Sequence, residues 1–303
     1  MPAPFLPEAF VEKFTRLLGS EAEEFFAYSR RKLGKSFRVN PLKAVMPAVQ
    51  ASLERQGFGL EPLSFSPEAF RVPGENIELG KTPEYALGSI AVQEASSMVP
   101  ALVLAPQPGQ LVLDACAAPG SKTSQMAALM ENQGGILALD VNRERVKSLK
   151  FTLGRLGVAN TVVALNDATK TAFPALFDRV LLDAPCSSEG LVRKRLDALK
   201  GWSPRLVEYK ARLQKKLILK AFDALKEGGQ LVYSTCTLSP EENEEVVQFL
   251  LAERPAAGLL SVRLPGFRFR PGLLEGLEAC ARVLPQDNDS EAFFVARLGK
   301  GKA

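Results

Sequence analysis

From residue 109 onward, short apolar runs of strand length alternate with longer stretches of helical periodicity. Helical patterns cover residues 121–131, 143–157 and 204–226, the last of them stopped by Gly228-Gly229. This alternation predicts right-handed crossovers and a parallel sheet of buried strands with helices on both faces, an α/β fold. The apolar runs are residues 111–115 (LVLDA), 136–140 (ILALD), 161–165 (TVVAL), 179–184 (RVLLDA) and 230–235 (QLVYST).

The residues before this pattern have a different character. Residues 7–33 have the pattern of short helices, and residues 37–72 combine short strand-like runs with one helical stretch. We therefore predict two regions: residues 1–105, with helices and a small α+β unit, and residues 106–303, which hold the α/β domain. A last apolar run, FFVARL near the end, predicts a late strand at an edge of the sheet or between the others.

Composition excludes several classes of protein. Hydrophobic residues make up 46% of the chain and charged residues 24%, as in ordinary soluble proteins. The N-terminus lacks the apolar segment of a signal peptide, and no stretch is apolar enough to span a bilayer, so we expect a cytoplasmic protein. With four cysteines, no CxxC pair and no histidine, we expect no metal site. Acid–base chemistry must then use carboxylates, lysine, cysteine or water.

Positive charge is concentrated in one segment. Residues 193–220 hold ten lysine and arginine residues against Asp197 and Glu208, a local net charge of +8 in a chain whose net charge is +4. Such a segment is typical of a phosphate-binding surface. A solvated amphipathic helix gives the same pattern, and charge alone leaves both interpretations open.

Ligands of parallel sheets bind at the carboxyl ends of the strands, so we examined the residues that follow each expected strand. The first turn reads DACAAPGSKT, where Ala117, Ala118 and Gly120 allow a ligand to approach the backbone and Ser121 could cap the next helix. The turn has neither GxGxxG nor GxxxxGKS, which disfavours dinucleotide and P-loop sites.

Two aspartates follow the next two strands. Asp140 could accept hydrogen bonds from ribose hydroxyls or cap the following helix, and both roles can coexist. Asp167, in LNDAT, is placed to contact an adenine amino group. Together with the small-residue turn, they favour an adenosyl ligand without phosphates, which indicates S-adenosylmethionine.

Two cysteines each follow a later strand. Cys186 lies in LLDAPCSSEG and Cys236 in VYSTCTLSPEENE, where Ser239-Pro240 is expected to begin a helix. A buried structural cysteine is the common alternative for each of them. Two cysteines at strand ends, each beside Asp, Ser or Thr, favour a chemical role.

These motifs, in this order and spacing, resemble those of the NOL1/NOP2/Sun family of RNA cytosine-5 methyltransferases. DACAAPGSKT, DAPCSSEG and YSTCTLSPEENE match three family motifs, and SFRVNPLK, VQEASSM, DALKGWSP and PQDNDSEAFFVARL extend the resemblance over nearly the whole chain. LPEAF and DALKGWSP are most similar to bacterial members that methylate 16S rRNA. Those members generally carry a C-terminal RNA-binding extension, which we expect this chain to lack.

The resemblance implies a Rossmann-like S-adenosylmethionine-dependent methyltransferase domain over residues 106–303 and a smaller N-terminal α+β RNA-binding region over residues 1–105. It implies RNA as the partner, with rRNA expected and tRNA as the alternative; we also expect a monomer. Cys236 would be the nucleophile, Cys186 the thiol that assists product release, and Asp183 a catalytic residue. The implied cofactor-binding residues are Cys116, Ala117, Ala118, Pro119, Gly120, Ser121, Lys122, Asp140, Arg145, Asp167 and Asp183.

The expected chemistry explains why a cysteine is needed. Carbon 5 of cytosine is a weak nucleophile, and a thiolate that adds at carbon 6 activates it. We expect a nearby positive charge, or the dipole of the helix after Pro240, to favour the thiolate of Cys236. In a DNA cytosine-5 methyltransferase, Cys186 would be the nucleophile instead. A non-catalytic ribosome-assembly factor is the alternative from another class, and measured methyl transfer separates the two.

Overall fold

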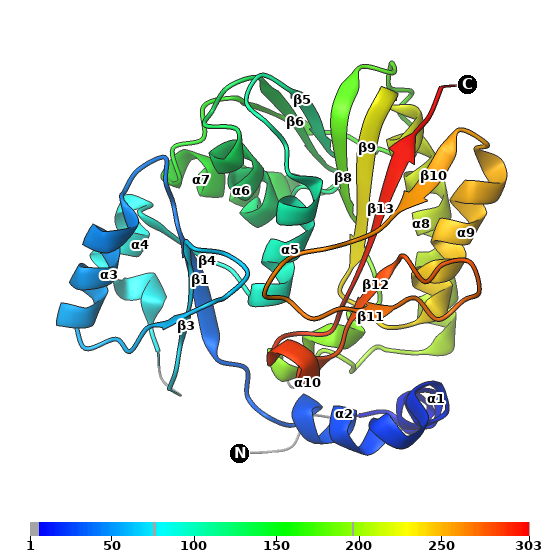
Figure 1. Cartoon of the computed structure of the whole chain (residues 1–303), viewed down its shortest axis with the longest axis horizontal. Coiled ribbons are helices and arrows are strands. Elements are labelled where there is room, and N and C mark those ends of the chain that lie inside the picture. Colours follow the sequence, from blue (N-terminus) through cyan, green and yellow to red (C-terminus); the bar gives the residue numbers. More distant parts are fainter. Residues whose placement is uncertain (1–5, 75–76, 196, 303) are drawn as a thin grey trace.

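In the computed structural model, which describes residues 6–74, 77–195 and 197–302, a nine-stranded sheet forms the centre of the larger part of the molecule (Figure 1). Its parallel strands lie in the order β7-β6-β5-β8-β9, and β13 pairs antiparallel with β9. The short strands β12, β11 and β10 complete the sheet on that side. The strands are β5 (Leu111–Asp114), β6 (Gly135–Asp140), β7 (Thr161–Leu165), β8 (Phe177–Asp183), β9 (Leu225–Thr235), β10 (Ala257–Leu260), β11 (Arg270–Pro271), β12 (Ala281–Val283) and β13 (Phe293–Lys300).

The strand order reverses between β5 and β8. The chain runs from β5 outward to β6 and β7, then returns to place β8 and β9 on the other side of β5. In open parallel sheets a ligand crevice forms at such a reversal, outside the carboxyl ends of the strands. The predicted α/β fold with a Rossmann-like sheet is therefore confirmed, including the late strand β13.

Helices cover both faces of the sheet (Figure 1). Adjacent side chains of one strand point to opposite faces, so Val112 packs under α5 and α6 while Leu113 packs under α8 and α9. The apolar runs of the central strands β5, β6, β8 and β9 are largely buried for this reason. The covering helices are α5 (Ala95–Leu104), α6 (Ser121–Leu129) and α7 (Arg143–Arg155) on one face, and α8 (Pro204–Asp223) and α9 (Glu244–Glu253) on the other. No helix among the described residues is both long and apolar enough to cross a membrane.

The N-terminal residues form two structures. The antiparallel sheet β2-β3-β1-β4 packs on α3, with Phe37 stacked on Phe70 at a centroid distance of 5.5 Å. Helices α1 and α2 pack instead on the larger part, where Phe10 meets Trp202 edge-on at 5.3 Å. The boundary at residue 105 stays a prediction. The elements are α1 (Glu8–Leu18), α2 (Ala22–Ser29), β1 (Lys35–Val39), α3 (Met46–Arg55), β2 (Glu61–Pro62), β3 (Ala69–Val72), α4 (Pro83–Leu87) and β4 (Ile90–Val92).

Two local expectations were wrong. The run TVVAL forms β7 at the edge of the sheet and is not buried, since Val162 is 68% exposed. The helix expected to end at Gly228-Gly229 ends earlier, at Asp223. The two glycines lie within β9, where the pairing with β8 shifts from Phe177–Leu225 to Arg179–Gln230 and Gly228 has a φ of 74°. They mark a strand irregularity, because glycine adopts that φ without a steric penalty.

A buried ion pair connects the sheet to the turn that follows β9. Arg282 in β12 donates from Nε and Nη2 to the carboxylate of Glu244, each at 2.6 Å, and from Nη1 to the carbonyl of Leu238 at 2.8 Å. The two side chains are 3% and 0% exposed. A paired guanidinium in such a site cannot be replaced singly without leaving a buried charge.

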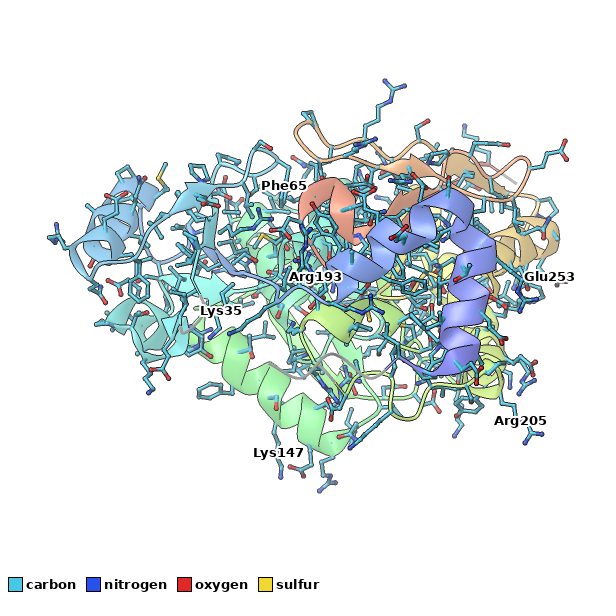
Figure 2. All side chains as sticks on the ribbon, turned by 90° about the horizontal axis from the view of Figure 1, so that it is seen from below. Lys35, Phe65, Lys147, Arg193, Arg205 and Glu253 are labelled. Atoms are coloured by element: carbon cyan, nitrogen blue, oxygen red, sulfur yellow. The ribbon has the colours of Figure 1, made fainter. Side chains whose placement is uncertain are left out.

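We predict that Arg282→Met lowers the free energy of unfolding by about 3–5 kcal/mol, since it leaves the Glu244 carboxylate buried without its partner. Adding Glu244→Leu should recover most of the loss because no charge then stays buried. Denaturant unfolding followed by circular dichroism measures both. The exposed pair Lys147–Glu144 supplies the control, and Lys147→Met should change little (Figure 2). Equal losses in Arg282→Met and Lys147→Met would contradict this interpretation of the pair.

Candidate active site

A cavity of about 360 Å³ lies at the carboxyl ends of the parallel strands, at the reversal of strand order. This volume is in the range of small-molecule sites. Every parallel strand contributes to it, and α8 closes one side. The lining residues are Ala115, Cys116 and Ala118 after β5, Asp140, Val141 and Arg145 after β6, residues 166–169 after β7, Asp183, Ala184, Pro185, Cys186 and Ser188 after β8, Cys236 after β9, and Lys210, Leu213 and Leu217 from α8.

At one end of the cavity, Asp140 presents a carboxylate. Its Oδ1 accepts from the backbone N–H of Asn142 at 3.0 Å, and Arg145 Nη1 lies 3.4 Å from its Oδ2. Asn142, and not Asp140, caps α7, because its side chain accepts from the backbone of residues 144 and 145. Arg145 also donates to the carbonyl of Ala118 at 2.5 Å and so connects the turns after β5 and β6.

Asp167 adds a second carboxylate at the end of β7. Thr169 donates to its Oδ1 from the hydroxyl at 2.6 Å and from the backbone at 3.0 Å. These hydrogen bonds hold the pKa of Asp167 below its ordinary value, so the group stays a charged acceptor. Opposite it, Leu213 and Leu217 of α8 supply an apolar wall. Carboxylate acceptors beside an apolar slot fit the hydroxyls and flat ring of an adenosyl group.

At the other end of the cavity, Cys186 and Cys236 lie with their Sγ atoms 3.2 Å apart. They follow β8 and β9, which are paired in register so that Asp183 lies opposite Ser234. The hydrogen bond to Cys236, followed by burial and the charge of Glu242, raises the pKa of Cys186 well above its ordinary value. Cys186 therefore holds its proton more tightly than an ordinary cysteine thiol does, and the two sulfurs are close enough for one S–H group to donate to the other.

A lysine–aspartate pair borders the two thiols. Lys122 Nζ donates to Asp183 Oδ2 at 2.7 Å and to Ser97 Oγ at 3.0 Å, while Ser234 donates to Asp183 Oδ1 at 2.8 Å. Burial alone would lower the pKa of Lys122, but Asp183 and then Cys236 raise it above its ordinary value, so the ammonium keeps its charge. Lys122 is thus a charged ammonium that is paired with Asp183 at this end of the cavity.

The helix expected after Pro240 differs from the expectation. A 3-10 turn, Pro240–Glu242, comes first, and α9 begins only at Glu244. A three-residue turn has little dipole, because few peptide groups are aligned. This turn therefore supplies little of the helix dipole that was expected at Cys236.

The remaining predicted residues are divided between the cavity and its support. Cys116 lines the cavity, but burial, with Asp114, Asp140 and Asp183 close by, raises the pKa of its thiol far above the ordinary value, which makes it a poor nucleophile. Ser121 does not cap α6, since Gly120 is the capping residue and has a φ of 105°. The predicted residues that do not line the cavity are Ala117, Pro119, Gly120, Ser121 and Lys122.

A buried carboxylate that the sequence analysis did not single out holds the turn carrying Cys236. Glu189, 2% exposed, accepts from the backbone N–H groups of Leu238 and Ser239 at 2.9 Å each and from Trp202 Nε1 at 2.8 Å. The hydroxyls of Thr237 and Ser239 donate to it as well. Its position in the motif DAPCSSEG, three residues after Cys186, is the sequence signal that could have identified it.

Glu242 supports the other turn. Its Oε2 accepts from the backbone N–H of Ser187 at 3.0 Å and from Gln214 Nε2 at 2.8 Å, while its buried Oε1 has no hydrogen-bond partner among the described residues. Burial raises the pKa of Glu242 to about 7. Gln214, Leu213 and Leu217 of α8 could not be identified from the sequence, because only the fold brings this helix over the cavity.

Two family models together cover most of the chain. The model of the 16S rRNA methyltransferase RsmB/F family matches residues 101–299. The model of the N-terminal domain of 16S rRNA methyltransferase RsmF matches residues 6–95.

Individual relatives match over nearly the whole chain. It is 46% identical over 299 residues to a tRNA (cytosine(49)-C(5))-methyltransferase of Pyrococcus abyssi, covering 96% of this chain and 95% of that protein. It is 44% identical over 307 residues to ribosomal RNA small subunit methyltransferase F of Cronobacter sakazakii, covering 97% of this chain but only 63% of that protein. The crystal structure of NSun6 from Pyrococcus horikoshii with SFG superposes with a TM-score of 0.88 at 25% identity, covering 98% of this chain and 99% of that one.

Three buried carboxyl groups near the site predict how stability depends on pH. Burial raises the pKa of Asp114, Glu242 and Glu291 to about 7, from 3.8 for aspartate and 4.5 for glutamate. Between about pH 5 and 7 the folded chain therefore binds protons that the unfolded chain has released, so the free energy of unfolding should fall as pH rises. Thermal unfolding at several pH values measures this, and Glu291→Gln should flatten the slope. A melting temperature that rises over this window would refute the prediction.

Proposed function

The chain belongs to the RsmB/F family of RNA methyltransferases, and we propose that it transfers a methyl group to carbon 5 of a cytosine in RNA. The observation that carries the proposal is the pair of thiols 3.2 Å apart at one end of a cavity whose other end presents Asp140 and Asp167. Family membership supports a methyltransferase, and the two cysteines support the covalent route to carbon 5.

In the proposed mechanism Cys236 is the nucleophile. Its thiolate adds to carbon 6 of the cytosine, which gives carbon 5 the electron density to accept a methyl group. Asp183, held by Lys122 and Ser234, lies beside the thiols, where it can hydrogen-bond the edge of the base. After carbon 5 has taken the methyl group, a base or water removes the proton from carbon 5, and the electron pair of that C–H bond re-forms the double bond between carbons 5 and 6. The bond from carbon 6 to sulfur breaks at the same time, which regenerates the thiolate of Cys236. Cys186 assists that elimination.

We propose S-adenosylmethionine as the methyl donor, and it supplies an electrophilic methyl group when bound. A relative solved with SFG, an analogue of that molecule, supports the assignment. In this chain Asp140 would hold the ribose hydroxyls and Asp167 the adenine amino group, with Leu213 and Leu217 against the ring. Asp140 is 4% exposed, so hydrogen bonds to it form away from bulk water, where they are strong.

The target base must be unpaired in this site. A cavity bordered by sheet turns and α8 cannot admit a base that is stacked in a duplex, so the cytosine is flipped out or lies in a single strand. We propose 16S rRNA as the substrate, because both family models carry that description. Transfer RNA is the second candidate, because the chain covers 95% of the archaeal tRNA methyltransferase and only 63% of the bacterial rRNA enzyme.

We predict opposite phenotypes for the two cysteines. Cys236→Ala should abolish methylation and form no covalent adduct, because the attacking sulfur is gone. Cys186→Ala should still attack and methylate but stall before elimination, so that a protein–RNA complex accumulates. Denaturing gel electrophoresis detects this complex, and RNase digestion should remove it. The double variant, which should form no complex, is the control; a complex in Cys236→Ala and none in Cys186→Ala would make Cys186 the nucleophile.

The substrate is tested with labelled S-adenosylmethionine and separate pools of 16S rRNA, 30S subunits and tRNA. We expect label in 16S rRNA, free or assembled, and bisulfite mapping should place it on one cytosine. Cys236→Ala run in parallel measures background. Label confined to tRNA would reject rRNA as the substrate while leaving the cysteine mechanism intact.

A further inference from the structure

A groove of about 450 Å³ runs along the outer side of α8, on the surface that faces α9. Its polar lining comes from Arg212, Lys215 and Lys216, and its apolar lining from Tyr209, Leu213, Leu219 and Phe249. Phe249 belongs to α9 and the rest to α8. We call it the α8–α9 groove.

The groove offers an exposed aromatic ring beside an apolar floor. Tyr209 is 57% exposed. Leu213 and Leu219 pack partly against the core and form the floor. The ammonium of Lys215 lies 5.7 Å from the ring centre of Phe249, which holds that lysine over the aromatic wall. Exposed aromatic rings beside cations are the usual platform for stacking unpaired bases.

The charge of the groove is of one sign. Three cations line it and no carboxylate does. Among the described residues, none of the three forms a salt bridge. Unpaired cations on a fixed surface attract a polyanion, because binding releases its condensed counterions.

Some cations of the basic segment, residues 193–220, are used in ion pairs within the fold. Arg193 is buried and pairs with Asp289, and Lys194 pairs with the buried Glu291. By contrast, Arg205 at the start of α8 extends outward at the periphery (Figure 2). The charge that is available to a ligand is therefore concentrated on α8.

The groove and the active-site cavity share one lining residue. Leu213 lines both the groove and the cavity that contains Cys236, and Lys210, one turn earlier, lines the cavity. One helix thus lines both sites. An RNA strand that is bound at Cys236 and continues over α8 would meet the groove.

We propose that the α8–α9 groove binds an unpaired base next to the target cytosine, stacked on Tyr209, with its phosphates held by Arg212, Lys215 and Lys216. The proposal rests on the proposed function, since it takes RNA as the substrate. The groove thereby selects RNA in which the nucleotides beside the target are also unstacked. A protein segment is the competing occupant, but a groove lined by three cations favours phosphates.

The test measures binding of a fluorescent single-stranded RNA of about ten nucleotides, a span that single-strand-binding folds cover, with one central cytosine. Fluorescence anisotropy without cofactor should give a dissociation constant about tenfold higher for Tyr209→Ala than for the wild type. Tyr209→Phe keeps the ring and should bind within about twofold of the wild type. Phe151→Ala, which removes a 69% exposed ring from α7, is the matched control and should not change affinity.

Abasic substitution in the same RNA locates the stacked base. Removing one base beside the cytosine should weaken wild-type binding but leave Tyr209→Ala unaffected, because the variant has already lost that contact. At saturating RNA, the kcat of methyl transfer should be unchanged in Tyr209→Ala while its KM for RNA rises.

Two results would contradict the proposal that the groove binds RNA. One is equal RNA affinity of the wild type and Tyr209→Ala, and the other is an equal loss of RNA affinity in Phe151→Ala. A Tyr209 effect on 30S subunits that is missing with naked RNA would assign the groove to a protein segment. Because anisotropy needs no methyl transfer, failure of the proposed chemistry would leave this measurement valid.

Discussion

The arrangement of the site depends on the hydrogen bonds that the buried carboxylate of Glu189 accepts. It accepts hydrogen bonds from the backbone of Leu238 and Ser239, directly after the turn that carries Cys236, and from Trp202 in the cluster under α1 and α2. Glu189 itself lies three residues after Cys186, so one buried charge fixes the turns after β8 and β9 relative to each other. The N–H of Gly190 donates to the carbonyl of Cys236 at 2.9 Å, and the backbone of Ala292 comes so close to Gly190 that a side chain there would not fit. Two thiols held 3.2 Å apart follow from this support and from the register of two parallel strands.

Three cysteine thiols in the cavity have different electrostatic surroundings. Cys116, Cys186 and Cys236 all line one cavity. Burial and three nearby aspartates raise the pKa of Cys116, and the hydrogen bond with Cys236 together with burial raises the pKa of Cys186. The ammonium of Lys122 lies close to Cys236, held in place by Asp183 and Ser97. The same cavity thus holds one thiol among carboxylates at the turn after β5 and a pair of thiols at the turns after β8 and β9, where buried charges are weakly screened.

Much of this could be predicted from the sequence, for reasons that particular residues make clear. Strand–helix alternation requires a parallel sheet, and a parallel sheet brings Asp140, Asp183 and Cys236 to one edge, so these positions were accessible from pattern alone. The resemblance to a family added the division of roles between the cysteines, which remains a prediction. The predictions that were wrong, and the site residues that were missed, depend on long-range packing. The exposure of β7 follows from its position at the sheet edge, the glycines after α8 belong to an irregularity in β9, and Leu213, Gln214 and Glu189 reach the site only through the folded chain.

The central claim, that the sulfur of Cys236 attacks carbon 6 of a cytosine in RNA, has one direct test. RNA in which cytosine is replaced by 5-fluorocytosine cannot lose a proton from carbon 5, so an attacking enzyme stays attached. Mass spectrometry of the digested wild-type complex then identifies the modified peptide. The account predicts a methylated fluorocytidine on the peptide that contains Cys236. The same adduct on Cys186, with an unmodified Cys236, would contradict it.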